Sequence, residues 1–317
     1  MLNFCSYFDK NYLSKFLVLR DSFKNLNCDI IFYVLPLDDF SYNFLKNKNF
    51  KNVILCNLNE LEKKFPDLNK IKNTRTNIEY YFTLSPYLPI FLQEKFNLEK
   101  LSYIDVDSFF FKNPEFFYKS LNVYSIILIK QNFKEKYGKF NVGWISYNFL
   151  HQDTKKILEK WKIECTNWCY DKVEKNRYAD QKYLDDWPSL SNDIIIYDPK
   201  VSMFSPWDSK NKCLIKNIEN FYCYHFQGLK FSKNYFISGI GIYNFNFERK
   251  FIKKFYSNYV ILLKKKQNEE DLVFTDNLSL RSGLIIYPTI IEKIYSRLKK
   301  IKFFLLSIIR MDFYTIN

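Results

Sequence analysis

Two aspartates separated by one residue follow an apolar run in the stretch LSYIDVDSFF. Residues 101–104 are typical of a buried strand, and Asp105 and Asp107 come directly after it. Successive side chains of a strand point to opposite faces, so we expect both carboxylates on the same side. Two neighbouring carboxylates repel each other unless a cation lies between them. The motif therefore predicts a divalent metal site, with a solvated pair at a strand end as the alternative for an isolated D-x-D.

Four further polar residues could act with this pair. His225, one of only two histidines, would either complete a metal site or be a core histidine with satisfied hydrogen bonds. Asn141 stands two residues before Gly143, where a glycine permits close backbone approach. Asp180 and Gln181 stand at the expected start of a helix, where an aspartate also serves as a cap. The second histidine, His151, is expected at the surface.

The composition indicates a globular protein with basic character. The chain has 317 residues, 47% of them hydrophobic, which suits one large α/β domain with an appendage or two domains. Its net charge of +14 favours polyanionic partners, namely nucleic acid, anionic lipid or a phosphorylated substrate. A basic nucleic-acid-binding protein without catalytic activity is therefore an alternative. Nucleic acid is the weaker choice, because the basic residues are spread along the chain and no motif of that class is present.

Cysteine and glycine usage excludes several kinds of site. The seven cysteines are odd in number and irregularly spaced, which fits neither a disulfide framework nor a zinc site, so we expect reduced thiols in a cytoplasmic protein. No secretory signal is visible, and no apolar run approaches the roughly 20 residues that a membrane-spanning helix needs. All six glycines lie beyond residue 130, so the N-terminal half has no glycine-rich phosphate loop. A metal would have to hold any phosphates there.

The elements around these residues alternate between strand and helix patterns. Strands are expected at 2–8, 28–36, 52–56, 101–104, 123–130, 141–148, 193–199 and 221–230, and helices at 11–26, 38–48, 60–97 and 153–163. This alternation predicts an α/β fold with a largely parallel sheet, whose ligands bind beyond the carboxyl ends of the strands. We expect a catalytic domain at 1–248 and a basic helical C-terminal region at 249–317.

The motifs, taken in order, resemble those of the metal-dependent glycosyltransferases of the GT-A fold, in particular the family-8-like bacterial sugar transferases. The matching stretches are FDKNYLSKFL, YIDVDSFFFKNP, FNVG, DQ and HFQGLK, which fall between residues 2 and 236. The resemblance implies a GT-A type Rossmann-like mixed, mainly parallel sheet with flanking helices. It also implies a nucleotide-diphosphate-sugar transferase.

The resemblance further assigns roles to the metal site and the diphosphate. Mn²⁺ or Mg²⁺ would be bound by Asp105, Asp107 and His225 and would neutralise the departing UDP of a UDP-sugar. Lys230 would pair with the diphosphate. It stands five residues after the histidine instead of six and lacks the following Pro-Trp, so Lys233 is a rival.

Base and sugar contacts are assigned in the same way. The uracil would be held by Asp9, Asn11 and Tyr12, and the sugar would be flanked by the catalytic set Asn141, Asp180 and Gln181. An arginine that is common in the family before the D-x-D strand is missing, and Arg75 or Glu79 would take its place.

The reaction expected from the resemblance is transfer of a hexose, with galactose or glucose favoured, and with retention of configuration. The acceptor would be a surface glycan such as lipopolysaccharide or capsule, or a lipid-linked glycan. An inverting GT-A transferase is the alternative, because Asp180, Asp185 or Asp186 could serve as its base.

The C-terminal tail is basic and amphipathic. An apolar stripe is expected on a helix over 290–310, formed by Ile291, Ile294, Leu298, Ile301, Leu305 and Ile308. Such a helix either packs on the domain or lies on an anionic membrane, which would place the protein peripherally on the inner face of the cell membrane. Deletion of 290–317 is expected to leave UDP binding unchanged, because all expected donor contacts lie before residue 236.

Overall fold

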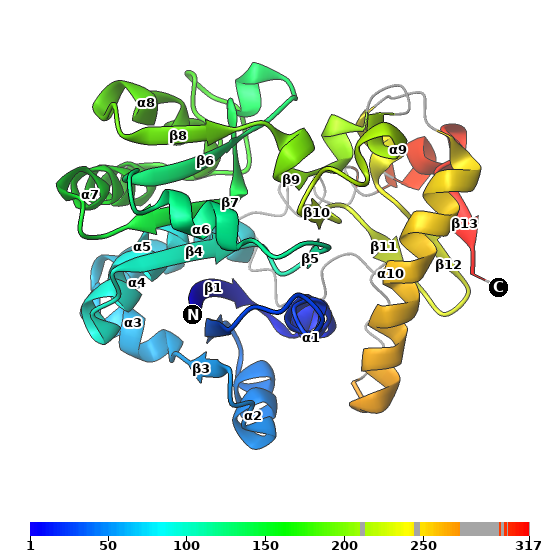
Figure 1. The fold of residues 1–317 in the computed structure, drawn as a ribbon, viewed down its shortest axis with the longest axis horizontal. Helices are drawn as coiled ribbons and strands as arrows, with labels where there is room; N and C mark the ends of the chain where they lie inside the picture. The colour runs from blue at the N-terminus through cyan, green and yellow to red at the C-terminus, as the bar shows by residue number, and fades with distance from the viewer. Residues whose placement is uncertain (210–212, 244–247, 273–297, 299–300, 303, 317) are drawn as a thin grey trace.

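Seven strands form the central sheet, in the order β3-β2-β1-β4-β7-β6-β8 (Figure 1). The computed structural model describes residues 1–209, 213–243, 248–272, 298, 301–302 and 304–316. The seven strands lie where the sequence predicts strands, and their bounds are β1 (Leu2–Phe8), β2 (Ile30–Pro36), β3 (Val53–Leu55), β4 (Lys100–Ile104), β6 (Ile126–Lys130), β7 (Phe140–Asn148) and β8 (Ile194–Tyr197).

The sheet is mixed and mainly parallel, as predicted. Four of its strand pairs are parallel, namely β1–β2, β2–β3, β1–β4 and β6–β8. Strand β7 runs antiparallel to both of its neighbours, β4 and β6. The nearly continuous apolar sequences of β1 and β2 follow from burial on both faces of the sheet.

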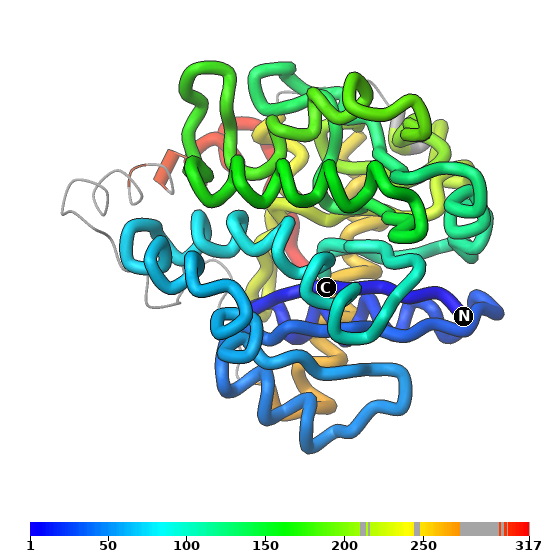
Figure 2. Tube along the Cα trace, turned by 90° about the vertical axis from the view of Figure 1, so that its left-hand side faces the viewer, coloured from blue at the N-terminus to red at the C-terminus, as the bar shows by residue number. Residues whose placement is uncertain are grey.

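Helices cover both faces of this sheet. Alternate residues of β4 divide between two apolar clusters, with Leu101 and Tyr103 on the side of α5 and α7, and Ile104 on the side of α1. Figure 2 shows α5 and α7 running side by side over the first of these faces. The helices that flank the sheet are α1 (Leu13–Ser22), α2 (Asp39–Lys48), α3 (Leu58–Lys64), α4 (Asp67–Lys72), α5 (Asn77–Phe96), α6 (Glu115–Ser120), α7 (Gln152–Asn167) and α8 (Trp187–Leu190).

Two small sheets lie beside the central one. The first has the order β5-β10-β9 and the second has the order β11-β12-β13. Their strands are β5 (Ser108–Phe110), β9 (Met203–Phe204), β10 (Cys223–His225), β11 (Lys230–Phe231), β12 (Tyr235–Ile237) and β13 (Phe313–Thr315). The short remaining helices are η1 (Lys10–Tyr12), η2 (Glu135–Tyr137), η3 (Gln181–Asp186), η4 (Pro199–Val201), η5 (Pro206–Asp208), α9 (Cys213–Asn217) and η6 (Ile240–Tyr243).

The first helix after residue 248 packs against both small sheets. Helix α10 (Arg249–Glu269) lies beside α1 (Figure 1), and its Tyr256 and Tyr259 join Tyr224 and Phe226 in a third apolar cluster. The aromatic rings of Phe226 and Tyr259 stack with centroids 3.8 Å apart. The boundary at residue 248 stays a prediction, but α10 contributes to the same core as β10.

The tail has two parts with different surroundings. Of the expected apolar stripe, Ile291 and Ile294 fall outside the described residues, whereas Leu298, Ile301, Leu305 and Ile308 are all exposed. Beyond them, β13 pairs with β12, and Tyr314 and Asp312 are buried. The deletion of 290–317 would therefore also remove a strand of the second small sheet, and its effect on UDP binding stays a prediction.

Two expectations concern membranes and thiols. Within the described ranges, no helix combines the length and the apolar character needed to cross a bilayer.

Six cysteines of the described chain are free thiols, as expected, namely Cys5, Cys28, Cys56, Cys165, Cys169 and Cys223.

Candidate metal and nucleotide site

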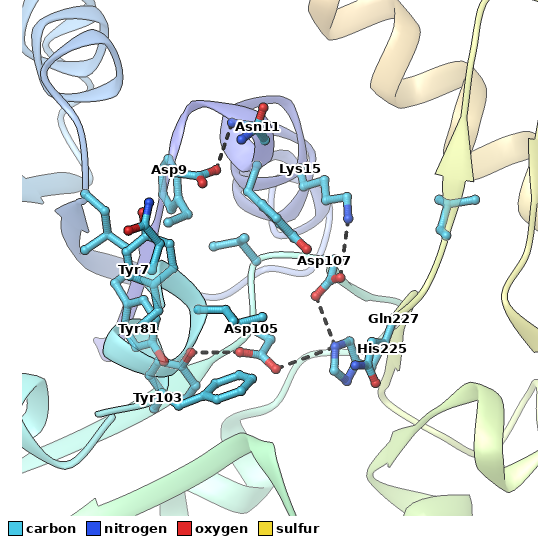
Figure 3. Close-up of a pocket in the computed structure, with 18 of the residues that line it drawn as sticks. Tyr7, Asp9, Asn11, Lys15, Tyr81, Tyr103, Asp105, Asp107, His225 and Gln227 are labelled. Carbon is cyan, nitrogen blue, oxygen red and sulfur yellow. Dashed lines mark hydrogen bonds and ion pairs between the residues drawn. The ribbon is translucent and has the colours of Figure 1, made fainter. Parts of the chain in front are cut away.

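A pocket of about 250 Å³ opens at the carboxyl ends of β1 and β4 (Figure 3). It lies where a parallel sheet is expected to bind its ligand. The pocket lining contains seven of the residues that the sequence singled out, namely Asp9, Asn11, Tyr12, Asp105, Asp107, His225 and Lys230. The lining also contains residues that were not predicted, among them Lys15, Tyr81 and Tyr103.

The two aspartates of the D-x-D motif lie in a turn that follows β4. The strand ends at Ile104, and the backbone N–H of Ser108 donates to the carbonyl oxygen of Asp105 at 3.2 Å. The expectation that strand alternation aligns the two side chains is therefore wrong. The turn brings the carboxylates together instead, and Figure 3 shows both directed at His225.

Strand pairing brings His225 to the motif. Strands β5 and β10 are antiparallel with His225 opposite Ser108, so the histidine at the end of β10 lies beside Asp107. Its Nε2 lies 3.0 Å from Asp107 Oδ1 and 3.5 Å from Asp105 Oδ2. The histidine is 3% exposed, and the ring of Trp207 contacts it edge-on. The Nε2 atom of His225 therefore faces two carboxylates that line the same pocket.

The three side chains fit a divalent cation. Their ligand atoms all lie within 4.8 Å of one another, which an ion with bonds of roughly 2.0–2.6 Å can bridge. Gly143 leaves room for this cluster, because a Cβ there would lie 2.9 Å from Asp105 Oδ2 and 3.1 Å from His225 Nδ1. Two carboxylates and one imidazole form a donor set that suits Mn²⁺ or Mg²⁺.

The two carboxylates differ in their affinity for a proton. Burial raises the pKa of Asp105 despite the opposing effect of His225, and the charge of Asp107 adds to the increase. Burial alone would also raise the pKa of Asp107, but Lys15 and His225 lower it below its usual range. Burial lowers the pKa of His225, but Asp107 and Asp105 together raise it by more, so the net shift is upward. Asp107 is therefore ionised and lies between two basic groups.

Lys15 is the principal residue that the sequence prediction missed. It comes from α1 and is 4% exposed, and its Nζ lies 3.4 Å from Asp107 Oδ2 and 4.2 Å from the centre of the Tyr12 ring. A lysine is rarely buried unless it is paired. One feature of the sequence could have identified Lys15. It lies within the apolar helix sequence LSKFLVL, one turn after Asn11.

A chain of buried hydroxyl groups lies behind the motif. The Tyr103 hydroxyl donates to Asp105 Oδ1 at 2.7 Å, and the rings of Tyr103 and Tyr7 are in contact. The Tyr7 hydroxyl lies 2.9 Å from Ser85 Oγ, which in turn donates to Asp180 Oδ2 at 2.5 Å. Burial raises the pKa of Asp180 to about 7. Asp180 is thus connected to Asp105 through side chains of β1, α5 and β4.

Of the three expected catalytic residues, Asn141 and Asp180 are buried and Gln181 is partly buried. Asn141 Oδ1 accepts from the backbone N–H of Gly143 at 2.8 Å, and its Nδ2 donates to Ser205 Oγ at 3.2 Å. Gln181 Nε2 donates to the carbonyl oxygen of Tyr137 at 2.7 Å. Within the described chain, the pocket lining does not include Asn141, Asp180 or Gln181.

The two rival bases lie elsewhere as well. Asp185 is 2.6 Å from Lys182 and accepts from the backbone N–H of Lys139, and Asp186 is exposed. Neither aspartate is part of the described pocket lining.

The structure distinguishes between the two candidate lysines and gives Arg75 and Glu79 structural contacts. Lys230 lines the pocket, whereas Lys233 is exposed and is not part of the described lining. Arg75 is buried, and its Nη2 donates to the carbonyl oxygen of Thr166 at 2.6 Å. Glu79 accepts from the backbone N–H of Thr76 in a capping box at the start of α5. Neither residue is part of the described pocket lining, and the expectation that Arg75 or Glu79 replaces a pocket arginine stays a prediction.

His151 behaves as a surface residue, as expected. It is partly exposed and precedes α7, where its Nδ1 accepts from the backbone N–H of Asp153, and its Nε2 lies 3.0 Å from Asp193.

Comparisons with known proteins give the fold of the chain. No protein-family model matches the sequence. It is 24% identical to the uncharacterized protein YfnD of Bacillus subtilis (strain 168) over 294 residues, which cover 86% of this chain and 92% of YfnD. The glycosyltransferase GlyE of Streptococcus pneumoniae TIGR4 superposes with a TM-score of 0.51 at 15% identity, over 86% of this chain and 64% of that of GlyE. Mouse xyloside xylosyltransferase 1 superposes with a TM-score of 0.50 at 13% identity, over 72% of this chain and 98% of that chain. The chain therefore has the GT-A fold of glycosyltransferases.

Proposed function

We propose that the protein is a metal-dependent glycosyltransferase that transfers a hexose from a UDP-sugar to a glycan. One observation carries the proposal. A single pocket at the carboxyl ends of β1 and β4 contains the D-x-D carboxylates, His225 and the Asp9–Tyr12 segment. The GT-A fold is compatible with this use of the pocket, and the site supplies the chemistry that the fold alone does not specify.

The metal end of the pocket would bind the diphosphate. Asp105, Asp107 and His225 would hold Mn²⁺ or Mg²⁺, which when bound neutralises the negative charge of the leaving nucleotide. Lys230 also lines the pocket and would contribute a positive charge to the diphosphate. Tyr103 would keep the carboxylate of Asp105 in position through its hydrogen bond.

The other end of the pocket would bind the uracil. Asp9 caps η1 by accepting from the backbone N–H of Asn11 at 3.0 Å, which fixes the turn that carries Asn11 and Tyr12. Tyr12 offers an aromatic ring on which a base can stack. Tyr81 and Leu37 add apolar surface to this end.

The sugar would lie near the buried residues behind the metal ligands. Asn141 is close to Asp105, because a Cβ atom added to Gly143 would lie within 3.1 Å of an oxygen of each side chain. Asp180 is linked to Asp105 through Ser85 and the tyrosines. We propose Asn141, Asp180 and Gln181 as the catalytic set, galactose or glucose as the sugar, and retention as the stereochemical outcome.

The acceptor would be a surface glycan such as lipopolysaccharide or capsule, presented as a lipid-linked glycan at the cytoplasmic side of a membrane. The exposed side chains of Leu298, Ile301, Leu305 and Ile308 support a membrane-facing tail. The net charge of +14 favours an anionic lipid surface.

Release of UDP from a panel of UDP-sugars tests the proposal, with each donor measured with and without Mn²⁺ or Mg²⁺. We expect slow hydrolysis of UDP-galactose or UDP-glucose that requires the metal. The proposal would be rejected if no donor is hydrolysed under any metal condition. A nucleic-acid-binding protein would bind labelled oligonucleotides and show no metal-dependent response to UDP.

A further inference from the structure

The buried ammonium group of Lys15 lies at the junction of the two halves of the pocket. Its Nζ is 3.4 Å from Asp107 Oδ2, while His225 contacts the other oxygen of that carboxylate at 3.0 Å. The same ammonium group lies 4.2 Å from the centre of the Tyr12 ring. Figure 3 shows the side chain extending from α1 toward Asp107. A metal ligand of the proposed site therefore already has an ammonium group beside it.

We propose that Lys15 is a built-in counter-cation of this site, which weakens binding of a divalent ion to the free protein and strengthens binding of a nucleoside diphosphate. The inference deepens the proposed function, since the ligand is the diphosphate part of a UDP-sugar. It assigns Lys15 a direct contact with that diphosphate. The metal and the nucleotide would consequently increase each other's affinity, and such coupling is reciprocal.

The charges around Asp107 support opposite effects on the two ligands. Asp105 and Asp107 together supply two negative charges, and Lys15 cancels one of them at close range. A divalent cation that approaches Asp107 is repelled by the ammonium group, whereas a diphosphate is attracted by it. Both effects are strong because Lys15 is 4% exposed, so that water and salt hardly screen its charge.

The position of Lys15 supports a contact with the diphosphate. The side chain of Lys15 lies between Tyr12 and Asp107. A nucleotide whose base stacks on Tyr12 and whose phosphates reach Asp107 would therefore lie beside this lysine. Lys15 contacts both of these residues. Lys230 lines the same pocket from β11, so cationic side chains approach the expected phosphate position from two different elements.

A purely structural role for Lys15 makes a different prediction. If the lysine only neutralised a buried Asp107, its loss would loosen the site and weaken both ligands together. If Lys15 is a counter-cation, its loss should increase the affinity for the divalent ion and decrease the affinity for the diphosphate. The direction of the change in metal affinity therefore distinguishes the two roles.

The experiment compares Lys15→Gln, Lys15→Arg and the wild-type protein. Mn²⁺ binding without nucleotide is measured by electron paramagnetic resonance of the free ion, and UDP binding in EDTA is measured by calorimetry. For Lys15→Gln we expect Mn²⁺ to bind about tenfold more tightly and UDP in EDTA to bind about tenfold more weakly. Lys15→Arg keeps the charge and should resemble the wild type in both assays. Lys24→Gln removes an exposed lysine next to α1 and should change neither affinity.

Parallel losses of both affinities in Lys15→Gln, or no change in either, would overturn the proposal. A measurement on the wild type covers the case in which this variant does not fold. Inorganic pyrophosphate should bind to the wild-type protein in EDTA, and lack of binding would also overturn the role of Lys15. If pyrophosphate binds but UDP does not, the nucleotide part of the proposed function fails and the role of Lys15 stands.

Discussion

Tyr103 fixes one oxygen of Asp105 at the edge of the pocket through a hydrogen bond of 2.7 Å. Groups that hold a metal ligand in place commonly change metal affinity by about tenfold or more when they are removed. We therefore expect Tyr103→Phe to weaken Mn²⁺ binding in the presence of UDP by about tenfold. UDP binding in EDTA should be unchanged. Tyr87→Phe is the matched control, because this buried tyrosine lies outside the described pocket lining and its hydroxyl contacts Thr166 instead of a ligand carboxylate.

Equal Mn²⁺ affinities for Tyr103→Phe and the wild type would show that Asp105 does not depend on this tyrosine. The melting temperature should be recorded for both variants, because a large decrease would indicate a loss of packing instead.

Asp180 makes stability depend on pH. Burial raises its pKa from 3.8 to about 7 in the folded protein, so the folded state holds a proton that the unfolded state releases. Its contribution is present below pH 4 and is lost as the pH rises toward 7, by at most about 1.4 kcal/mol per pH unit. In Asp180→Asn this loss should disappear. Urea unfolding at pH 5, 6, 7 and 8 should thus show a flatter decrease for the variant, and parallel curves would contradict the shifted pKa.

At the scale of elements, the site depends on a close approach between β4 and β7. The backbone N–H of Asp105 donates to the carbonyl oxygen of Gly143 at 2.9 Å, which leaves no room for a side chain there. Gly143→Ala should displace Asp105 and His225 and weaken Mn²⁺ binding by about tenfold or more. Overpacking should also lower the free energy of unfolding by about 1–3 kcal/mol.

A matched substitution on the same strand separates the two effects. Val142→Ala precedes the glycine and lies outside the described pocket lining, so it should lower stability without a specific loss of Mn²⁺ affinity. If Gly143→Ala binds Mn²⁺ like the wild type, the cluster is less tightly packed than the distances indicate.

Local patterns predicted the central sheet because each of its strands is an apolar segment that a helix follows or precedes. Strands β5, β9 and β13 have three, two and three residues and lie outside the strands expected from the sequence. These strands exist because of pairing between distant segments, such as His225 opposite Ser108. The sequence motifs therefore pointed to the proposed metal ligands, whereas the pairing that unites them was visible only in three dimensions.

The same reason explains the gaps in the predicted site. The contact of Lys15 with Asp107 could not be predicted from the sequence, because it is α1 that places the lysine against Asp107, which is 92 residues away in the chain. Asn141 and Gln181 match family motifs, but the motif cannot reveal that their amide groups bond to Ser205 and to the carbonyl oxygen of Tyr137. Residue types predicted a candidate metal site, and long-range contacts determined which side chains line the pocket.

At the scale of the whole molecule, the exposed part of the tail can be tested without damage to the fold. Leu305 and Ile308 are each about half exposed, so a double substitution to serine should leave the melting temperature unchanged. If these residues contact a membrane, binding to vesicles that contain anionic lipid should fall several-fold, and UDP binding should stay the same. Co-sedimentation at low and high salt measures this effect. Unchanged vesicle binding would contradict the membrane role of the tail.

The buried part of the tail should behave differently. Asp312 accepts from the backbone N–H of Gly241 at 2.9 Å and from the Ser238 hydroxyl, and both donors are buried. Asp312→Ala leaves these donors without an acceptor and should lower the free energy of unfolding by about 1–3 kcal/mol. Asp312→Asn keeps one carbonyl acceptor and should cost less. Equal urea midpoints for Asp312→Ala and the wild type would contradict the proposed anchoring.

The pairing of β13 with β12 has a consequence for the synthesis of the chain. Strand β12 leaves the ribosome well before β13, so one of its edges stays unpaired while the preceding part of the chain is already folding. An open edge of this kind is a template for pairing with other chains. Nascent molecules should therefore be most prone to aggregate in the interval between the two strands, and a chain that stalls in this interval should keep the exposed edge. Lys230 begins the neighbouring strand β11, so the unpaired edge of β12 lies one strand away from a residue of the pocket lining.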